Sequence, residues 1–137
     1  MVVDASVIVS RLVWHDVHHE ASRRWLAAHV ARGGLVVAPV LLLPEVAGAV
    51  ARRTAESRLA RQAVDAVLGL PALRLVAVDE TLGRAAARLA GRLRLRGADA
   101  VYIATAAALR LPLVTWDVEQ RDRARRVVTV LAPDDGE

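Results

Sequence analysis

The sequence predicts an α/β fold, a three-layer α/β/α sandwich in which helices cover both faces of a central, mostly parallel sheet. Its 137 residues suit a single domain with one hydrophobic core. Short runs of consecutive apolar residues alternate with longer segments whose apolar residues recur at helical spacing. Strands that are apolar on both sides are typical of parallel sheets, because helices bury both faces of such a sheet.

Five apolar runs are the expected strands: residues 1–3, 35–38, 73–78, 112–115 and 127–131. Between them, helical periodicity predicts helices over residues 5–12, 16–32, 41–54, 56–70, 79–94 and 98–109. Asp16 is the expected N-cap of the second helix, and Pro44 is tolerable in the first turn of the third, where its missing N–H has no partner to lose. We therefore assign residues 1–132 to the domain and expect the acidic tail, residues 133–137, to be disordered.

The composition excludes several classes of protein. With 55% hydrophobic residues the chain can bury a core, and because it has no Phe and one Tyr this core is expected to be aliphatic. The lack of Cys excludes disulfides and thiolate metal sites. The N-terminus lacks the basic and apolar regions of a signal peptide. The longest uncharged stretch, residues 33–44, is too short to span a membrane, so we expect a soluble, cytoplasmic protein.

Four acidic residues occupy positions that a parallel sheet brings together. Asp4 ends the first strand, and Asp117 follows the fourth. Glu45 lies near the start of the helix after the second strand, and Asp99 opens the 98–109 helix. In open parallel sheets, sites form outside the carboxyl ends of the strands, where the strand order reverses. Each acid taken alone is explained as a helix cap or a turn residue, but all four at this edge indicate a shared site.

Four crowded carboxylates need a neutralising charge, because each close pair repels by about 4 kcal/mol in a protein-like medium. The chain has no Lys and no Cys, so a divalent cation is the economical answer, and oxygen ligands favour Mg²⁺ or Mn²⁺. A cation held by Asp4 and Asp99 lowers the pKa of a bound water, and a second cation stabilises a leaving oxygen. The sequence leaves open whether one or two ions bind. This chemistry suits the hydrolysis of a phosphodiester.

At this point the motifs resemble those of a known family. The opening "MVVDASVIVS" is similar to the first motif of PIN domains, and "APVLLLPEVAGAVAR" to the second, whose Glu is Glu45 here. The segment "ADAVYIATAAALRLPLVTWD" resembles the third and fourth motifs, with a helix opened by Asp99 and a strand leading to Asp117. The four motifs occur in the family's order and cover nearly the whole chain. Its length points to the VapC-type toxins within that superfamily.

The resemblance implies a Mg²⁺- or Mn²⁺-dependent endoribonuclease, the toxin of a VapBC toxin–antitoxin pair. It implies that Asp4 and Asp99 are the main metal ligands, that Glu45 and Asp117 complete the site, and that Ser6 and Thr115 are supporting residues. It also implies a homodimer that a VapB-like antitoxin inhibits. An acidic edge is a natural receptor for an inserted Arg, and the helices around residues 40–50 and 56–70 offer a groove for a partner helix.

All 19 basic residues are Arg, and the formal net charge is +4. Arg binds phosphate through two parallel hydrogen bonds, although a genomic preference for Arg codons explains the absence of Lys equally well. Seven arginines flank Asp99 and Asp117, and we predict that some of them hold an RNA backbone. These are Arg92, Arg94, Arg96, Arg121, Arg123, Arg125 and Arg126. The alternative is a solvated charge run that pairs with Glu119 and Asp122 along a helix.

Other interpretations are weaker on the same residues. A phospho-acceptor receiver domain also gathers acids at a sheet edge, but it needs a Lys, and this chain has none. A PIN-like module that binds RNA or protein without cutting remains the alternative, although all four acids are present. The histidines His15, His18, His19 and His29 are expected to belong to a solvated helix rather than a zinc site. Trp116 is expected to pack locally rather than stack on a base.

Overall fold

The computed structural model describes residues 1–135, which form an α/β domain around a five-stranded sheet. The strands are β1 (Val2–Val3), β2 (Val36–Pro39), β3 (Leu73–Val76), β4 (Leu113–Val114) and β5 (Val130–Leu131). Their order across the sheet is β3-β2-β1-β4-β5, and every neighbouring pair is parallel. The predicted α/β fold with a parallel central sheet is confirmed.

The strand order reverses at β1. From β1 the chain crosses to β2 and β3 on one side, and it then returns past β1 to add β4 and β5 on the other. Val2 therefore pairs with both Val37 of β2 and Leu113 of β4. The carboxyl ends of β1 and β4 lie side by side at this reversal, which is the place where parallel sheets form ligand sites.

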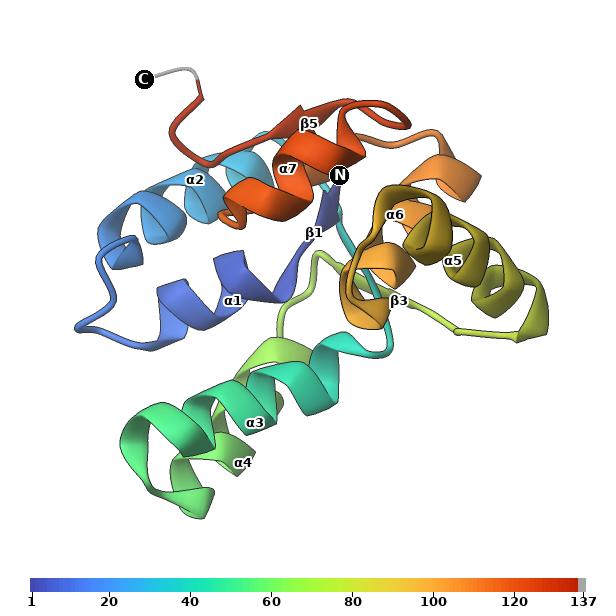
Figure 1. Ribbon diagram of the computed structural model, residues 1–137. Helices are drawn as coiled ribbons and strands as arrows, with labels where there is room; N and C mark the ends of the chain where they lie inside the picture. The colour runs from blue at the N-terminus through green and yellow to red at the C-terminus, as the bar shows by residue number, and fades with distance from the viewer. Residues whose placement is uncertain (136–137) are drawn as a thin grey trace.

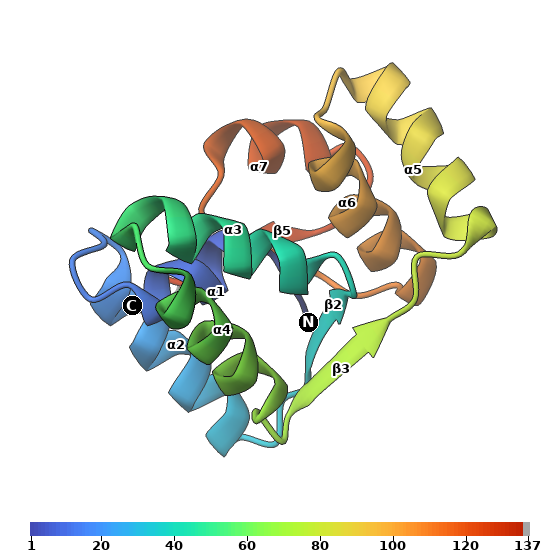
Figure 2. The same ribbon diagram turned by 90° about the horizontal axis from the view of Figure 1, so that it is seen from below.

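Seven helices in the described part of the chain cover the sheet. They are α1 (Ala5–Leu12), α2 (His19–Ala31), α3 (Leu42–Thr54), α4 (Ser57–Leu68), α5 (Glu80–Leu93), α6 (Gly97–Leu109) and α7 (Val118–Ala124). Helix α6 packs on β1, β2 and β4, and α5 packs on α6. Helices α1 to α4 lie on the other side of the strands (Figures 1 and 2). Among the described residues, none of these helices combines the length and the apolar character needed to cross a bilayer.

The core is aliphatic, as the composition predicts. Val2 and Val3 of β1 are fully buried, and Ile8, Leu42 and Ile103 bring three helices onto the strands. Each fully buried aliphatic side chain of this size contributes about 1.5–3 kcal/mol through removal of apolar surface from water. Tyr102 is the largest fully buried side chain among the described residues. Its hydroxyl reaches toward Glu45 at the acidic edge of the sheet.

The structure corrects several predicted boundaries and adds one element. Helix α7 was not among the predicted helices, and β5 is shorter than the predicted strand over residues 127–131. Helix α2 begins at His19 rather than beside Asp16, because the Asp16 carboxylate accepts the N–H of His18 and closes a turn before the helix. Pro44 does lie in the first turn of α3. Of the predicted disordered tail, residues 133–135 form a turn, and residues 136–137 lie outside the described residues.

Candidate active site

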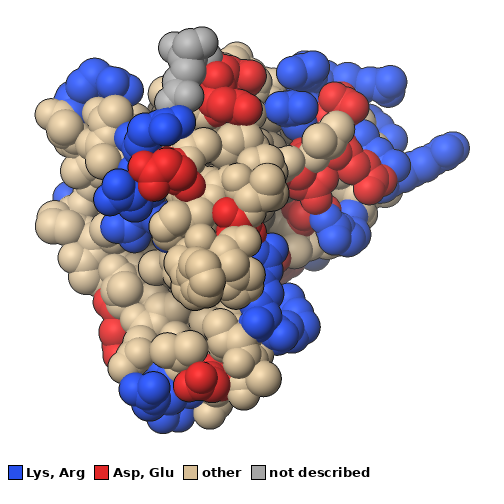
Figure 3. All heavy atoms as spheres, turned by 90° about the vertical axis from the view of Figure 1, so that its left-hand side faces the viewer, with Lys and Arg blue, Asp and Glu red and all other residues tan. Residues whose placement is uncertain are grey.

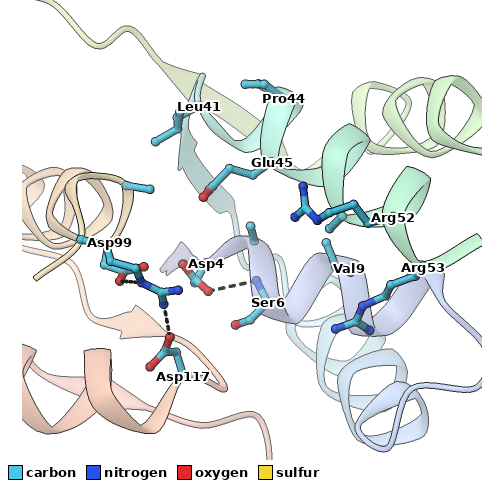
Figure 4. Close-up of a pocket in the computed structure, with 14 residues that line it drawn as sticks. Asp4, Ser6, Val9, Leu41, Pro44, Glu45, Arg52, Arg53, Asp99 and Asp117 are labelled. Carbon is cyan, nitrogen blue, oxygen red and sulfur yellow. Dashed lines mark hydrogen bonds and ion pairs between the residues drawn. The ribbon is translucent and has the colours of Figure 1, made fainter. Parts of the chain in front are cut away.

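A cavity of about 600 Å³ opens at the carboxyl edge of the sheet, where the strand order reverses. All four acids predicted from the sequence line it: Asp4, Glu45, Asp99 and Asp117. They come from the end of β1, the first turn of α3, the first turn of α6 and the start of α7. Figure 4 shows their carboxylates directed into the same space. Residues more than one hundred positions apart in the chain thus share one site.

Asp4 is held by more partners than any other acid of the cavity. It is the N-cap of α1, and its Oδ2 accepts the N–H of Ser6 at 2.9 Å. The same oxygen accepts the Thr115 hydroxyl at 3.2 Å, and Thr115 lies 3.3 Å from the Ser6 hydroxyl. The two residues predicted as supporting, Ser6 and Thr115, therefore both fix the orientation of the Asp4 carboxylate, which is only 6% exposed.

Asp117 is placed by the loop between β4 and α7. Its N–H donates to the Thr115 hydroxyl at 3.0 Å, and its Oδ1 accepts the N–H of Gln120 at 2.9 Å as the N-cap of α7. The Gln120 side chain is fully buried and turns inward, with its Nε2 3.4 Å from Asp4 Oδ1 and 3.5 Å from the Asp99 carbonyl. Gln120 therefore links three acids of the site, and the sequence analysis did not find it.

Arg96 bridges two acids of the cavity, Asp99 and Asp117. Its Nε donates to Asp99 Oδ2 at 2.8 Å, and its Nη2 donates to Asp117 Oδ2 at 2.7 Å (Figure 4). The guanidinium is largely exposed, whereas the Asp99 carboxylate retains only 16% exposure. Arg96 was predicted as an RNA contact, and the structure places it among the acids as their nearest positive charge.

Burial and mutual repulsion make it unfavourable for the carboxyl groups of the site to ionise. Burial raises the pKa of the Glu45 carboxyl above its usual range; the Tyr102 hydroxyl offsets part of this rise, and repulsion from Asp4 and Asp99 adds to it. Burial likewise raises the pKa of Asp99, although Arg96 acts in the opposite direction. Tyr102 has its own pKa raised by burial and by the negative charge of Asp4 and Glu45. A cation entering the cavity would relieve these costs.

The donor set fits a hard divalent cation. Glu45 Oε2 is buried and has no hydrogen-bond partner of good geometry within the described chain. Within the described residues, Asp4 Oδ1 accepts only the long bond from Gln120. Oxygen donors of this kind are those that Mg²⁺ and Mn²⁺ prefer. Although the four acids line one cavity, no three His, Cys, Asp or Glu side chains within residues 1–135 are arranged closely enough to hold a metal ion, and Arg96 binds both Asp99 and Asp117.

Five of the seven predicted RNA-binding arginines line two separate hollows. Arg96 lines the acidic cavity, while a second hollow of about 450 Å³ lies between the end of α5 and α7. Arg92, Arg94, Arg123 and Arg126 line this second hollow together with Asp122. The alternative role, a solvated charge run with ion pairs along a helix, applies to two of these arginines. Arg123 pairs with Glu119, and Arg125 lies 3.9 Å from Asp122. Arg121 is half-buried, and its Nε has no partner in the described residues.

The histidines and Trp116 have structural roles. The ring of His18 stacks on that of Trp116 with centroids 3.9 Å apart, and the Trp116 indole donates to Ser22 at 2.7 Å. Trp116 thus packs locally, as predicted. His18 and His19 are half-buried rather than solvated, whereas His15 is exposed. His29 is buried, with its Nε2 3.0 Å from the Leu35 carbonyl.

Two further arginines, missed in the sequence, line the acidic cavity. Arg52 and Arg53 lie in the last turn of α3, across the cavity from Asp99 and Asp117 (Figure 4). Arg53 is an ion-pair partner of Asp16. The spacing of Arg52 from Glu45, seven residues or two helical turns, was the available signal, because residues at this spacing share a helix face.

Comparisons with known proteins agree with this architecture. A family model described as PIN domain matches residues 1–126. VapC20 of Mycobacterium tuberculosis, described as a sarcin-ricin loop cleaving toxin, has a TM-score of 0.75 at 20% identity, covering 87% of this chain and 91% of that chain. FitAcB of Neisseria gonorrhoeae has a TM-score of 0.73 at 20% identity, with 96% of each chain covered. VapBC2 of Rickettsia felis, bound to a promoter DNA fragment, has a TM-score of 0.71 at 14% identity, with 96% of each covered. No curated protein sequence matches the chain.

Proposed function

This chain belongs to the PIN-domain family, and on that premise we propose that it is a Mg²⁺- or Mn²⁺-dependent endoribonuclease acting in the cytoplasm as the toxin of a VapBC-type toxin–antitoxin pair. The observation that carries the proposal is the convergence of Asp4, Glu45, Asp99 and Asp117 on one cavity at the reversal of strand order. Family membership supports a nuclease, and the acidic donor set supports dependence on a metal.

In this proposal, some residues of the site hold the metal and others orient the residues that hold it. Asp4 and Asp99 would hold the metal, and Glu45 and Asp117 would complete its ligand set. A bound metal of this class supplies an activated water and stabilises negative charge on the phosphate. Thr115 and Gln120 keep the Asp4 carboxylate in one orientation through their hydrogen bonds. Such outer partners of metal ligands usually affect metal affinity or activity by about 10- to 100-fold.

Arginines around the cavity support RNA as the substrate. The hollow lined by Arg92, Arg94, Arg123 and Arg126 lies between α5 and α7, beside the elements that carry Asp99 and Asp117. Its guanidinium groups can bind backbone phosphates without reading the bases. We expect this contribution to affinity to be salt-dependent and independent of sequence. Sequencing the cut ends of total RNA after induction would identify the RNA that is cleaved.

An apolar groove supports the antitoxin part of the proposal. A hollow of about 330 Å³ lies between the end of α1, α3 and α4, where the sequence predicted a groove for a partner helix. Leu12, Val50, Leu59 and Ala63 line it, and Trp14 at its rim is 81% exposed. The side of the molecule shown in Figure 3 has a broad uncharged surface bordered by arginines and acids. Such a surface suits an amphipathic helix with charged flanks.

The expected homodimer has its own candidate surface. An apolar hollow of about 480 Å³ lies between α5 and α6, lined by Leu89, Ala104, Ala108 and Val127 among others. Small residues there would let two copies approach closely. Light scattering on the purified chain tests the dimer, and co-expression with any small protein that proves to be encoded beside it tests the antitoxin.

The decisive experiment is cleavage of RNA by the pure protein with Mg²⁺ or Mn²⁺ and with EDTA. We expect cleavage only with metal, and a loss of at least about 100-fold for Asp4→Asn and for Asp99→Asn. Asp65→Asn, on the exposed face of α4, is the matched control and should cleave normally. Cleavage that persists in EDTA would reject the metal mechanism. RNA binding without cleavage in any metal would favour the alternative, a PIN-like module that binds but does not cut.

A further inference from the structure

Arg52 faces the acidic cavity from the side opposite Asp99 and Asp117, the two acids that Arg96 binds (Figure 4). It lies on α3 two helical turns after Glu45, so both side chains project from the same face of the helix. Both residues line the cavity. In Figure 4 the Arg52 side chain extends back from the end of α3 toward the carboxylates, whereas Arg53 turns away toward the α1 side.

The residues between Glu45 and Arg52 leave room for this approach. Gly48 and Ala49 are the residues one turn before Arg52, and neither carries a long side chain. A Cβ added at Gly48 would stand only 3.0 Å from Arg52 Nη1, so the guanidinium lies directly over the Gly48 backbone. A glycine inside a helix costs about 0.5–1 kcal/mol relative to alanine. Here its absence of a side chain lets Arg52 lie along α3 and point into the cavity.

Arg52 differs from its neighbours in having no acidic partner among the described residues. Arg53 pairs with Asp16, and Arg96 pairs with Asp99 and Asp117. An arginine that served only the helix dipole would place its charge near the last carbonyls of α3. The Arg52 guanidinium instead lies one turn back, over Gly48. Its donors are therefore available to a ligand that enters the cavity.

We propose that Arg52 binds a backbone phosphate of the RNA next to the phosphate that reaches the carboxylates, so that a single strand crosses the cavity from α3 to α6. This inference rests on the proposed function. A polyanion entering a cavity walled by four acids needs cations on both sides. Arg96 supplies one beside Asp99 and Asp117, and Arg52 supplies another from α3, across the cavity from these two acids in Figure 4. The fork of a guanidinium matches two phosphate oxygens. Arg52 is therefore a substrate-binding residue on the side where the sequence predicted none.

The test is binding rather than cleavage. Fluorescence anisotropy with a short 5′-fluorescein oligouridylate, in EDTA and over a range of salt concentrations, compares the full chain with Arg52→Gln, Arg52→Lys and Arg32→Gln. Arg32 is exposed and precedes β2, so it lies at the opposite edge of the sheet. We expect Arg52→Gln to bind about tenfold more weakly, at the low end for a charge-assisted hydrogen bond. The slope of log K against log salt should shrink by about 0.7.

The controls separate charge from geometry. Arg52→Lys should keep the salt slope and lose part of the affinity, because Lys retains the charge without the fork. Arg32→Gln should bind like the wild type. Equal RNA affinity of Arg52→Gln and the wild type would overturn the proposal, even if Arg52→Gln lost antitoxin binding. A loss of RNA affinity in Arg32→Gln as large as that in Arg52→Gln would overturn it as well. Because EDTA prevents metal-dependent cleavage, the result is independent of whether the protein proves to be a nuclease.

Discussion

Asp4 serves both the fold and the candidate site through different oxygens. Its Oδ2 accepts from the Ser6 N–H and the Thr115 hydroxyl, which fixes the start of α1 against the end of β4. From the part of the chain that the structure describes, its Oδ1 accepts only the 3.4 Å contact from Gln120, a weak bond at that length. One oxygen is thus committed to structure, and the other is positioned but poorly satisfied. A helix cap and a metal ligand are compatible roles for one carboxylate.

Replacing Gln120 with leucine tests this division. The side chain is fully buried and its Oε1 has no partner in the described chain, so Leu of similar size should change the free energy of unfolding by no more than about 1 kcal/mol. The loss of the donor to Asp4 should lower Mn²⁺ affinity and RNA cleavage by about tenfold. Mn²⁺ binding followed by electron paramagnetic resonance measures the first effect without catalysis. Gln62→Leu, exposed on α4, is the control. Unchanged Mn²⁺ affinity in Gln120→Leu would contradict the positioning role.

Arg96 gives a second prediction, because it competes with a cation for Asp99 and Asp117. Its two exposed ion pairs are worth up to about 1 kcal/mol each. Together the two pairs amount to at most about 2 kcal/mol, so Arg96→Gln should raise Mn²⁺ affinity by at most about 30-fold, while lowering the affinity for RNA. Arg84→Gln, which removes an exposed pair with Glu80 on α5, should change neither quantity. A fall in Mn²⁺ affinity in Arg96→Gln would show that Arg96 assists the metal instead of competing with it.

At this scale the sequence predicted the acids but not the side chains between them. Asp4 and Asp117 follow strands directly, so their place in the chain determines their place at the sheet edge. Gln120 and Arg52 depend on which way one helix face turns, which requires the packed structure. A local signal for Gln120 did exist, because Asp117-x-x-Gln120 resembles a capping box.

Helix α7 illustrates why an element was missed. It has seven residues, of which five are charged or polar, and its buried residues are only Gln120 and Ala124. A short helix with so little apolar surface has almost no periodic signal. Helix α1, of similar length, was predicted with correct bounds because its residues Val7, Ile8 and Val9 are apolar and buried. Helix boundaries could be predicted where the buried residues follow the apolar pattern of the sequence. They could not be predicted where a cap or a tertiary contact determines where the helix begins or ends.

Helix α3 gives a prediction in which stability and binding change in opposite directions. Gly48→Ala should raise the free energy of unfolding by up to about 1 kcal/mol through helix propensity. The new Cβ would stand 3.0 Å from Arg52 Nη1 and shift that guanidinium by a few tenths of an ångström, so affinity for oligouridylate should fall by a small factor. Gly91→Ala in α5 is the matched control, because nothing lies within 4 Å of its Cβ. It should be stabilised to a similar degree with no change in RNA binding.

An equal RNA affinity in Gly48→Ala and Gly91→Ala would contradict the placement of Arg52 over Gly48. Thermal unfolding and anisotropy on the same samples measure both quantities.

In the whole molecule, the site is a consequence of topology. The parallel order β3-β2-β1-β4-β5 brings the ends of β1 and β4 together, and the first turns of α3 and α6 deliver Glu45 and Asp99 to the same cavity. Buried apolar strands that alternate with helices, which the sequence shows, predict a parallel sheet with right-handed crossovers, but they do not fix the order of its strands. The sequence could not specify that Arg96 would close the gap between Asp99 and Asp117, because that contact depends on a side-chain conformation in an exposed position.

The concentrated charge also makes the stability of the molecule depend on pH. Burial first, and then repulsion from neighbouring acids, raises the pKa of Glu45 in the folded state above its ordinary 4.5. Between the ordinary and the raised value the folded chain binds more protons than the unfolded chain, so the stability contributed by this group falls as pH rises. Above the raised pKa the penalty is complete. In EDTA, Glu45→Gln should therefore be more stable than the wild type at neutral pH, and the difference should shrink as the pH falls toward 4.5.

A metal should reverse this penalty, because it binds the deprotonated ligands of the folded state only. Excess Mn²⁺ at neutral pH should raise the Tm of the wild type, raise that of Glu45→Gln less, and leave the double variant Asp4→Asn, Asp99→Asn unchanged. Denaturant unfolding across a pH series, with EDTA and with Mn²⁺, measures each component separately. A difference between the wild type and Glu45→Gln that stays constant with pH would mean that Glu45 ionises as a solvated acid. An equal Tm increase in the double variant would place the metal outside the cavity, since the acids expected to hold it would then be dispensable.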